Sequence, residues 1–312
     1  MSALICGSLA YDNIMVFQGR FREHILPDKI HMLNVAFLVP DMRREFGGCA
    51  GNIAFNLVQL GGDGAPVGSV GHDFGPYSAW MDRCGVRQDY LQQVDSAFTA
   101  QAYITTDMDD NQITAFHPGA MTHSHEMDLP QNVGATLGIV SPDGRDGMLK
   151  RATEFAAADI PFVFDPGQGL PMFDGAELLD FIDKATWVAV NDYEGEMLRE
   201  RTGLSLDQIA QRVEALVVTR GGKGSAIYSK GRVLEIPAAP VNVLTDPTGC
   251  GDAYRAGLLF GLMKGADWET TGRLGSIMGA IKIEHAGTQN HKIDWQTFGL
   301  RYREAFSREL DI

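Results

Sequence analysis

The 312-residue chain is 45% hydrophobic and carries a formal net charge of −14, from 26 Lys and Arg against 40 Asp and Glu. This composition predicts a large buried core and excludes an intrinsically disordered chain. The acidic balance, with no dense run of Lys or Arg, argues against nucleic acid or an anionic membrane as a partner. No long, uncharged apolar stretch predicts a membrane span.

The cysteines indicate a reducing compartment. They are scattered, and no two of them form a C-x-x-C pair. Neither a disulfide framework nor a zinc site is therefore indicated, and we expect a cytoplasmic protein. Residues 1–10 lack a basic region, so we predict a first buried strand there rather than a signal peptide.

Short apolar runs alternate with helical patterns along the chain, which is typical of buried parallel strands. These runs are Leu4–Leu9, Leu137–Val140, Phe162–Phe164, Val188–Val190 and Leu216–Thr219. They predict an α/β fold with a central, mostly parallel sheet flanked by helices. Ligands of such sheets bind beyond the carboxyl ends of the strands, where Asp165, Asn191 and Thr219 fall.

Two regions, residues 13–46 and 98–118, break this rhythm. Their β-type segments are 15–17, 35–39, 102–105 and 113–116, and residues 109–111 predict a turn between the last two. We expect antiparallel strands that form a small β-sheet lid on a single domain spanning residues 1–312. The alternative is that these strands lie at the edge of the main sheet.

A first glycine motif, Phe46-Gly-Gly-Cys-Ala-Gly-Asn52, leads into a predicted helix, Ala50–Leu60. Bare backbone at Gly47 and Gly48 would let a small ligand lie against the chain, and Asn52 offers a donor and an acceptor to hydroxyls. Close packing of a helix on a sheet would explain the glycines equally well.

A second motif, Asp246-Pro-Thr-Gly-Cys-Gly-Asp252, precedes a predicted apolar helix, Ala253–Met263. The glycines allow consecutive N–H groups to point one way, and the helix adds the positive end of its dipole, so a phosphate would bind there. Asp252 could accept the proton of a hydroxyl that attacks the phosphate. The alternative is an ordinary turn in which Asp252 is the N-cap.

Together these two motifs resemble the signatures of the PfkB (ribokinase-like) family of carbohydrate and nucleoside kinases. Asn191-Asp-Tyr-Glu194 is similar to the family's N-x-x-E pattern, and Thr219–Gly224 is similar to its T-x-G-x-x-G stretch. The resemblance covers essentially the whole chain. Cys250 replaces the usual alanine and Pro247 the usual threonine, and neither change removes an N–H from residues 249–251.

The resemblance implies an ATP-dependent kinase that uses Mg²⁺, with Asp252 as the catalytic base. The amides of Gly249, Cys250 and Gly251 would form the anion hole. Asn191 and Glu194 would act near Mg²⁺ and the phosphates, Glu194 through water. Helix capping by this pair is the structural alternative.

The resemblance also places the nucleotide base and a second cation. The adenine would lie between a strand-end loop and the late stretch 276–289, in contact with Thr219, Gly221, Gly224 and Gln289. Asp246 and Thr248 would take part in a monovalent cation site, with K⁺ as the candidate ion.

For the acceptor, the resemblance implies that Asp12 binds the vicinal hydroxyls of a ribose-like ring. Gly47, Gly48 and Asn52 would help to turn the primary hydroxyl toward Asp252. A solvated turn residue is the alternative for Asp12.

Within the family, the sequence looks closest to bacterial nucleoside kinases, including adenosine kinase. We therefore expect transfer of the γ-phosphate to the 5′-hydroxyl of adenosine or a broader set of purine nucleosides. Lid sheets pair to form homodimers in some members of the family and stand alone in others, so the resemblance leaves a homodimer through the lid and a monomer open. Side chains available to sandwich a purine are Phe17, Phe37, Tyr103, Phe116 and Met121. Two alternatives remain: a kinase of ribose, fructose or a phosphorylated hexose, for which Arg20, Arg22, Arg43 and Arg44 are available, and a noncatalytic sensor.

Overall fold

The computed structural model describes residues 2–25, 31–32, 34–109, 111–130 and 133–312. A wide sheet forms its centre, with strands in the order β13-β12-β11-β10-β9-β8-β1-β4-β5. The strands from β5 to β11 pair in parallel, and β12 and β13 pair antiparallel at one edge. Their bounds are β1 Ser2–Cys6, β4 Asp63–Gly71, β5 Tyr90–Val94, β8 Ala135–Val140, β9 Phe162–Phe164, β10 Trp187–Asn191, β11 Ala215–Thr219, β12 Ser225–Ser229 and β13 Arg232–Ile236.

The predicted α/β fold with a mostly parallel sheet is confirmed. Each of the five predicted apolar runs contains or overlaps a strand, although the first strand ends at Cys6 rather than Leu9. Four further strands, β4, β5, β12 and β13, were not predicted. β4 carries three internal or terminal glycines and Pro66 among its small residues, so its sequence looks like a turn although the strand is almost wholly buried.

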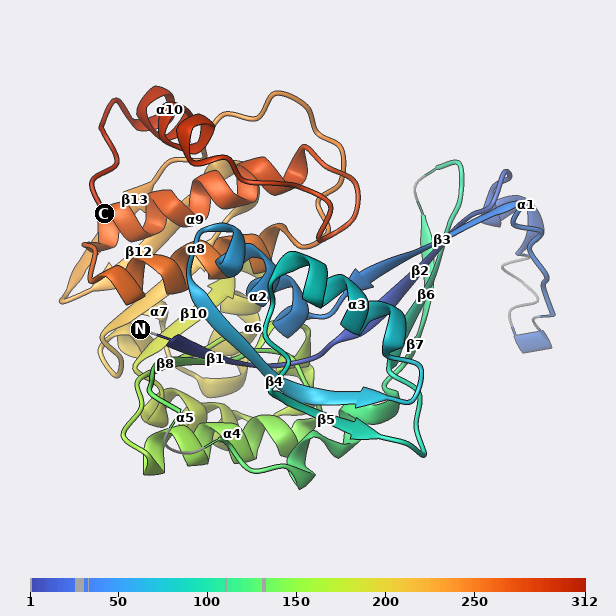
Figure 1. Cartoon of the computed structure of the whole chain (residues 1–312), viewed down its shortest axis with the longest axis horizontal. Coiled ribbons are helices and arrows are strands. Elements are labelled where there is room, and N and C mark those ends of the chain that lie inside the picture. The colour runs from blue at the N-terminus through green and yellow to red at the C-terminus, as the bar shows by residue number, and fades with distance from the viewer. Residues whose placement is uncertain (1, 26–30, 33, 110, 131–132) are drawn as a thin grey trace.

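Helices cover both faces of the wide sheet (Figure 1). One face packs against α2 Cys49–Gln59, α3 Gly75–Cys84, α8 Cys250–Lys264, α9 Trp268–Ile283 and α10 Trp295–Phe306. The other packs against α4 Arg145–Ala157, α5 Gly175–Lys184, α6 Asp192–Thr202 and α7 Leu206–Ala210. In the parts of the chain that the structure describes, every helix is too short or too polar to cross a bilayer.

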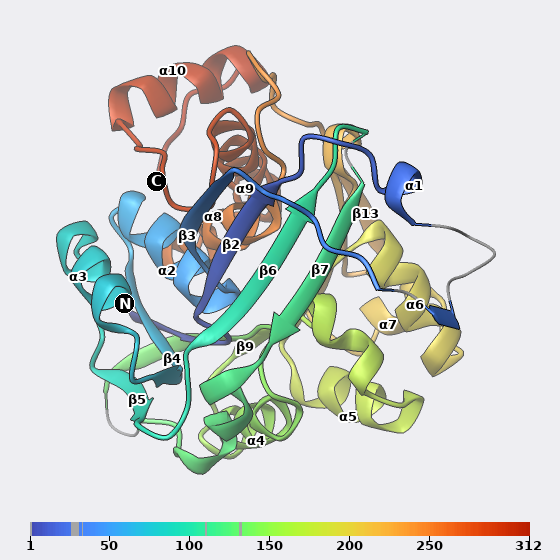
Figure 2. The same cartoon turned by 90° about the vertical axis from the view of Figure 1, so that its right-hand side faces the viewer.

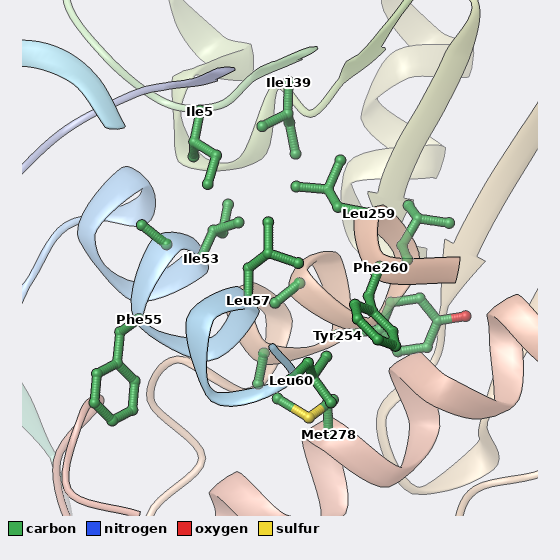
Figure 3. Packing of buried hydrophobic residues seen from close by; sticks show 14 of the residues in the cluster. Ile5, Ile53, Phe55, Leu57, Leu60, Ile139, Tyr254, Leu259, Phe260 and Met278 are labelled. Atoms are coloured by element: carbon green, nitrogen blue, oxygen red, sulfur yellow. The ribbon is translucent and has the colours of Figure 1, made fainter. Parts of the chain in front are cut away.

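Strand residues alternate between these two cores, as the period of a β-strand requires. Ile5 and Ile139 face α2 and α8, whereas their neighbours Leu4 and Val140 face the opposite core. Figure 3 shows Ile5 and Ile139 above Ile53 of α2, with Leu259 of α8 beside them. This packing fixes the start of α2 and of α8 at the same end of the sheet.

The α8–α9 pair packs unusually closely. A Cβ added at Gly257 would lie 2.6 Å from the backbone nitrogen of Gly275, so only glycine fits at this crossing. Leu258 and Leu259 of α8 are fully buried, and so are Leu274 and Ile277 of α9. The pair therefore forms a rigid support for the loop that precedes α8.

A second, smaller sheet stands off the wide one (Figures 1 and 2). Its strand order is β3-β2-β6-β7, and we call it the small sheet. The bounds are β2 Ala10–Val16, β3 Asp41–Gly47, β6 Ala100–Thr106 and β7 Gln112–His117. This confirms a separate small sheet over its placement at the edge of the wide sheet.

The pairing within the small sheet is partly as predicted. β2 with β3 and β6 with β7 are antiparallel, but the central pair β2–β6 is parallel. β2 follows β1 and β6 follows β5, and β1 and β5 point the same way, so both segments leave the wide sheet from one edge and run outward together.

The predicted strand at 35–39 is wrong. Residues 34–39 are irregular, and the strand begins at Asp41. Phe37 instead packs on Phe17 and Phe21, each with ring centroids 4.9 Å apart, while Leu38 is 86% exposed. The apolar run therefore covers an aromatic cluster beyond the strands rather than pairing with one.

The predicted turn between β6 and β7 is organised by a residue just before it. The Asp107 carboxylate accepts the N–H groups of Asp109 and Asn111, each at 2.9 Å. Asp110 lies outside the described residues. Short helices complete the fold: α1 Phe21–His24, η2 Gly119–Glu126, η3 Gly167–Met172 and η4 Gly221–Lys223.

Candidate active site

A cavity of about 810 Å³ opens at the carboxyl ends of the parallel strands, between them and the helices α8 and α9. Asp165 follows β9, Asn191 ends β10 and Thr219 ends β11, and all three line this cavity. The structure thus brings them together at the sheet edge where they were expected.

The large cavity has a charged end and an apolar end. Asp165, Glu194, Asp252 and Arg255 lie at the first. The second is walled by Ala238, Ala239, Val241, Leu244, Ala280 and Ile283. Segment 238–244 was not assigned to the site from sequence, because it has no regular structure and no motif. A ligand with a charged part and a flat apolar part would suit this polarity.

The start of α8 excludes one of the two sequence interpretations of Asp252, the N-cap. Gly249 is the N-cap, in the left-handed region with φ +78°, so the N-cap alternative for Asp252 is wrong. Asp252 lies in the first helical turn, where the N–H groups of Gly251 and Asp252 have no carbonyl partner within the helix. With the helix dipole, these amides favour an anion in the cavity.

One of the three predicted anion-hole amides is already engaged. The N–H of Cys250 donates to the carbonyl of Pro247 at 3.2 Å, closing the turn before α8. A Cβ added at Gly249 would lie 3.1 Å from Cγ2 of Thr288, so glycine is favoured there by packing as well as by φ. We call the N–H groups at the start of α8 the phosphate cradle. The N–H groups of Gly251 and Asp252 are free to bind an anion there, whereas that of Cys250 is already engaged.

Asp252 is held by Asn52, whose Nδ2 donates to Oδ2 of Asp252 at 2.8 Å. Burial and, to a smaller extent, the nearby charge of Asp165 raise the pKa of Asp252 to about 7, although the Asn52 hydrogen bond and Arg255 oppose this shift. A carboxylate with a pKa near neutrality is suited to accepting a proton from a hydroxyl.

A chain of hydrogen bonds orients Asn52. Gln289 Nε2 donates to Asn52 Oδ1 at 3.0 Å and to the hydroxyl of Tyr77 at 2.7 Å, and Trp80 Nε1 donates to Gln289 Oε1 at 3.0 Å. This chain leaves the Nδ2 end of Asn52 turned toward Asp252. The buried Gln289 does not line the large cavity, which corrects the expectation that it contacts adenine.

A buried cation was missed by the sequence analysis. Arg255, one turn after Asp252, places Nη2 3.0 Å from Asp165 Oδ1 and 3.9 Å from Glu194 Oε2. Arg255 and Asp165 are both at least 95% buried, and all three side chains line the cavity. The available signal was an arginine within the apolar run of α8, because a buried arginine requires a partner.

Asn191 and Glu194 form a full capping box at the start of α6. Asn191 Oδ1 accepts the N–H of Glu194 at 2.8 Å, and Glu194 Oε2 accepts the N–H of Asn191 at 2.7 Å. Both residues also line the cavity. Burial raises the pKa of Glu194 above its ordinary value, and the charge of Arg255 opposes that shift.

The loop after β11 lines the opposite side of the cavity with Thr219, Gly221 and Gly224. Gly224 has φ +85°, and a Cβ there would lie 2.0 Å from the carbonyl oxygen of Ile236. Its requirement for glycine is therefore structural. Ser276 and Ile283 of α9 line the same cavity, and the placement of adenine between the two segments stays a prediction.

The predicted acceptor residues lie outside the large cavity, at the base of the small sheet. A Cβ added at Gly47 would lie 2.5 Å from Oδ2 of Asp12, and one at Gly48 would lie 2.5 Å from the carbonyl oxygen of Ser8. Burial raises the pKa of Asp12 to about 6, with the charges of Glu45 and Asp246 adding to the shift. Asp12 therefore lies on the side of the small sheet that faces the second motif.

The strand register shows which side chains share that side. Asp12 is opposite Glu45 and Ala102, and Ala102 is opposite Phe116. Residues paired in this way lie on one face, and so do residues two positions along. We call this surface the Asp12 face; it includes Glu45, Asp12, Ala102, Phe116, Ile14, Ile104 and Arg43.

The five side chains predicted to sandwich a purine do not lie together in the structure. Phe116, 52% exposed, is on the Asp12 face, whereas Tyr103 pairs with Asn13 and lies on the opposite face. Phe17 and Phe37 pack within the aromatic cluster. Met121 lies in η2. Ile14 and Ile104 were not predicted, because the alternation of a strand is visible only once its register is known.

The four arginines considered for a sugar phosphate contact other side chains. Arg20 and Arg22 pair with Asp109 at 2.9 and 3.6 Å, and Arg43 pairs with Glu45 at 3.6 Å. Arg44 donates to Asn13 at 2.9 Å. Of these four, Arg43 is the one whose strand position places it on the Asp12 face.

Asp246 is bound from several directions. Its carboxylate accepts the N–H groups of Thr248 and Gly287, each at 2.9 Å. Its carbonyl oxygen accepts a hydrogen bond from Lys282 Nζ at 2.8 Å. The loop before α8 is thereby fixed to the end of α9 and to the loop that follows it.

Comparisons with known proteins agree with this geometry. The pfkB family carbohydrate kinase profile matches residues 12–295. A nucleoside kinase of Methanocaldococcus jannaschii is 33% identical over 264 residues, which is 84% of this chain and 87% of that protein. The structure of Burkholderia thailandensis nucleoside kinase in complex with inosine is 51% identical, covers 98% of this chain and 99% of its own, and has a TM-score of 0.90.

Another structure of the Burkholderia thailandensis enzyme, described as a complex with ADP-inosine, has a TM-score of 0.87 at 52% identity and covers 98% of this chain and 97% of its own. The predicted family and the ribokinase-like fold are thus confirmed. The chain belongs to the pfkB family of carbohydrate kinases and is a phosphotransferase that acts on a hydroxyl group.

Proposed function

We propose that this protein is an ATP-dependent nucleoside kinase that phosphorylates the 5′-hydroxyl of purine nucleosides. The relatives named above are nucleoside kinases, and one of them is described with inosine. That ligand favours a purine set broader than adenosine alone. The observation that carries the proposal is the position of Asp252, which lines the large cavity and also contacts Asn52 on the side of the acceptor residues.

Asp252 is the proposed base. It would take the proton of the 5′-hydroxyl while that oxygen attacks the γ-phosphorus, the bond to the β-phosphate oxygen breaks and ADP leaves. The N–H groups of Gly251 and Asp252, with a smaller part from Gly249 and Cys250, would stabilise the charge on the transferred group. A helix N-terminus favours that charge without any movement during the reaction.

ATP would occupy the large cavity, whose volume of about 810 Å³ suits a ligand of this size. Its phosphates would lie at the charged end, near Arg255 and Asn191, and its adenine at the apolar end between Thr219–Gly224 and α9. Gly279 leaves room there, since a Cβ added to it would meet nothing closer than the Cys250 carbonyl at 3.7 Å.

Magnesium fits this cavity through an indirect contact. Glu194 Oε2 already accepts an N–H and lies near Arg255, and both carboxylate oxygens of Asp165 have partners in Arg255 and Ser141. Mg²⁺ keeps much of its water shell, so Glu194 would hold it through water. The ion would neutralise charge on the phosphates.

The nucleoside would bind between Asp252 and the Asp12 face. Asp12 would accept hydrogen bonds from the ribose hydroxyls, and Gly47 and Gly48 would let the ring approach the backbone. Asn52 would contact the ribose as well as the carboxylate of Asp252. Phe116, Ile14 and Ile104 offer the purine an apolar surface. The small sheet would close over the nucleoside and exclude water.

A sugar kinase is less well supported. A sugar phosphate needs at least two cations near the acceptor. Arg20, Arg22 and Arg43 are paired with carboxylates, Arg44 is bonded to Asn13, and only Arg43 of the four lies on the Asp12 face. A noncatalytic sensor would not need a carboxylate such as Asp252 at the cradle. The single domain of residues 1–312 and a homodimer through the small sheet stay predictions.

The test is ATP consumption with Mg²⁺ and inosine, adenosine, guanosine, cytidine, ribose, fructose or fructose 6-phosphate as acceptor. We expect turnover on the purine nucleosides, with the product identified as the 5′-monophosphate. Turnover on free sugars alone would replace the proposal with the sugar kinase. ATP binding by calorimetry with no turnover on any acceptor would favour the sensor.

A further inference from the structure

Lys282 is a fully buried lysine in the last turn of α9, with 0% of its surface exposed. Its Nζ donates to the carbonyl oxygen of Asp246 at 2.8 Å and to that of His285 at 3.1 Å. A buried ammonium group is costly unless it is paired, so a lysine at this place requires an explanation.

The two carbonyls belong to two different loops. Asp246 lies in the loop before α8, at the start of the second glycine motif, and His285 lies in the loop after α9. That second loop continues to Thr288, which donates to the carbonyl of Phe46, and to Asn290, which donates to Glu45 at 2.9 Å. Lys282 therefore lies where the cradle, the end of α9 and the base of the small sheet are joined.

We propose that Lys282 is a built-in monovalent cation that holds the cradle loop in its active position, so that this protein needs no potassium. The inference deepens the proposed function and rests on it for the activity measurement. It replaces the expectation that Asp246 and Thr248 take part in a K⁺ site.

The residues present do not fit a potassium ion beside Lys282. A monovalent cation is bound by oxygen atoms, above all backbone carbonyls, and the Asp246 carbonyl already accepts the ammonium group at 2.8 Å. A second positive charge next to that group would be repelled. The Asp246 carboxylate is also engaged, because its two oxygens accept the N–H groups of Thr248 and Gly287.

The electrostatics support a charged lysine. Burial lowers the pKa of Lys282 from its ordinary value, and the neighbouring negative charges of Asp246 and Asp252 oppose that shift. The end of α9 adds the negative pole of a helix dipole. An ammonium group fixed here also avoids the entropy of capturing an ion from solution.

The test is to measure turnover of Lys282 variants with and without potassium. In the Lys282→Ala variant the truncated side chain leaves space beside the two carbonyls, and in Lys282→Met an apolar chain fills it. We expect turnover by the unmodified protein to be the same in tetramethylammonium chloride and in KCl. Lys282→Ala should lose activity by at least about tenfold in tetramethylammonium chloride, because a charged hydrogen-bond donor is removed, and regain most of it in KCl or NH₄Cl.

Lys282→Met should stay inactive in both salts, which separates an ion effect from a general salt effect. Lys264→Ala is the matched control, since Lys264 is an exposed lysine at the end of α8 and its loss should change neither activity nor salt response. A merely structural role for Lys282 would give a variant that potassium does not rescue.

A second readout does not depend on finding the substrate. The Tm of Lys282→Ala should rise with KCl relative to tetramethylammonium chloride, whereas that of the unmodified protein should not. Activation of the unmodified protein by K⁺, or equal Tm values for Lys282→Ala in the two salts, would overturn the inference. If no acceptor is phosphorylated but the Tm difference is present, the result would count against the proposed kinase and not against the role of Lys282.

Discussion

The two sides of the proposed site are built differently. The large cavity lies among loops that are tied to the wide sheet, where capping boxes, required glycines and the buried Arg255 pair fix each wall. The acceptor side is one face of a four-stranded sheet that extends away from the core, with Phe116 exposed. The rigid side suits a phosphate donor common to many kinases, and the projecting side suits the choice of acceptor.

Asp252 links the two sides, so its loss should have the largest effect. We expect Asp252→Asn to lower kcat by about three orders of magnitude, because the amide cannot accept the proton of the hydroxyl. Its affinity for ATP, measured by calorimetry, should change little. A kcat within a factor of about ten of the unmodified value would exclude Asp252 as the base.

Filling the apolar end should affect the donor side alone. In Gly279→Leu the new side chain would enter the space proposed for adenine and raise KM for ATP by at least about tenfold. The free energy of unfolding should not fall, since glycine is a poor helix former and the site is open toward the cavity.

Gly299→Leu in α10 is the matched control for that change. A Cβ at Gly299 meets nothing within 4 Å, so KM for ATP should be unaltered in this variant. A rise in the nucleoside KM, rather than the ATP KM, in Gly279→Leu would reverse the assignment of the two sides.

Replacing Asp12 should affect the acceptor side alone. We expect Asp12→Asn to raise KM for the nucleoside by roughly tenfold, because hydrogen bonds to a charged acceptor are stronger than those to an amide. KM for ATP should stay the same. Asp207→Asn, at an exposed position in α7 away from both sides of the site, is the control and should alter neither constant. An unchanged nucleoside KM in Asp12→Asn would remove the proposed ribose contact.

The same contrast explains what could be predicted from the sequence. The cavity is assembled from local motifs at strand and helix ends, so Asn191, Thr219 and the cradle glycines could be assigned from their spacing. The strand β4 could not be predicted, because its glycines and Pro66 are typical of a turn rather than of a buried strand. Helix ends were less predictable: α8 begins at Cys250, three residues before the predicted start, which moves Asp252 into its first turn.

Individual side-chain contacts between distant segments were harder to predict than the sheet edge at which the segments meet. Gln289 and Asn52 are 237 positions apart, and Arg255 and Asp165 are 90 apart. No spacing rule relates residues this far apart, and even the arginine within the apolar run of α8 signals a buried partner without identifying it. For the same reason, the side chains that share a face of the small sheet could not be predicted, because β2 pairs with β6, a strand far away in the sequence.

The pH dependence of kcat/KM tests the state of Asp252. A base works in its deprotonated form, and the pKa of Asp252 is raised to about 7. Activity should therefore be full above that pH and fall as the pH is lowered through it. Asp252→Asn should lack this fall at low pH, the acidic limb of the profile. A midpoint near 4, the ordinary range of an aspartate, would contradict the raised pKa.

Gln289 should have the smallest effect, because it acts on Asp252 only through Asn52. In Gln289→Met the Asn52 carboxamide loses the donor that fixes its orientation, so its Nδ2 would donate less often to Asp252. Since that hydrogen bond favours the charged carboxylate, its weakening raises the pKa, and the acidic limb should move to higher pH by a few tenths of a unit. Above the limb, kcat should stay close to the unmodified value. A limb that does not move while kcat falls would mean that Gln289 supports the packing around Tyr77 and Trp80 rather than the charge of the base.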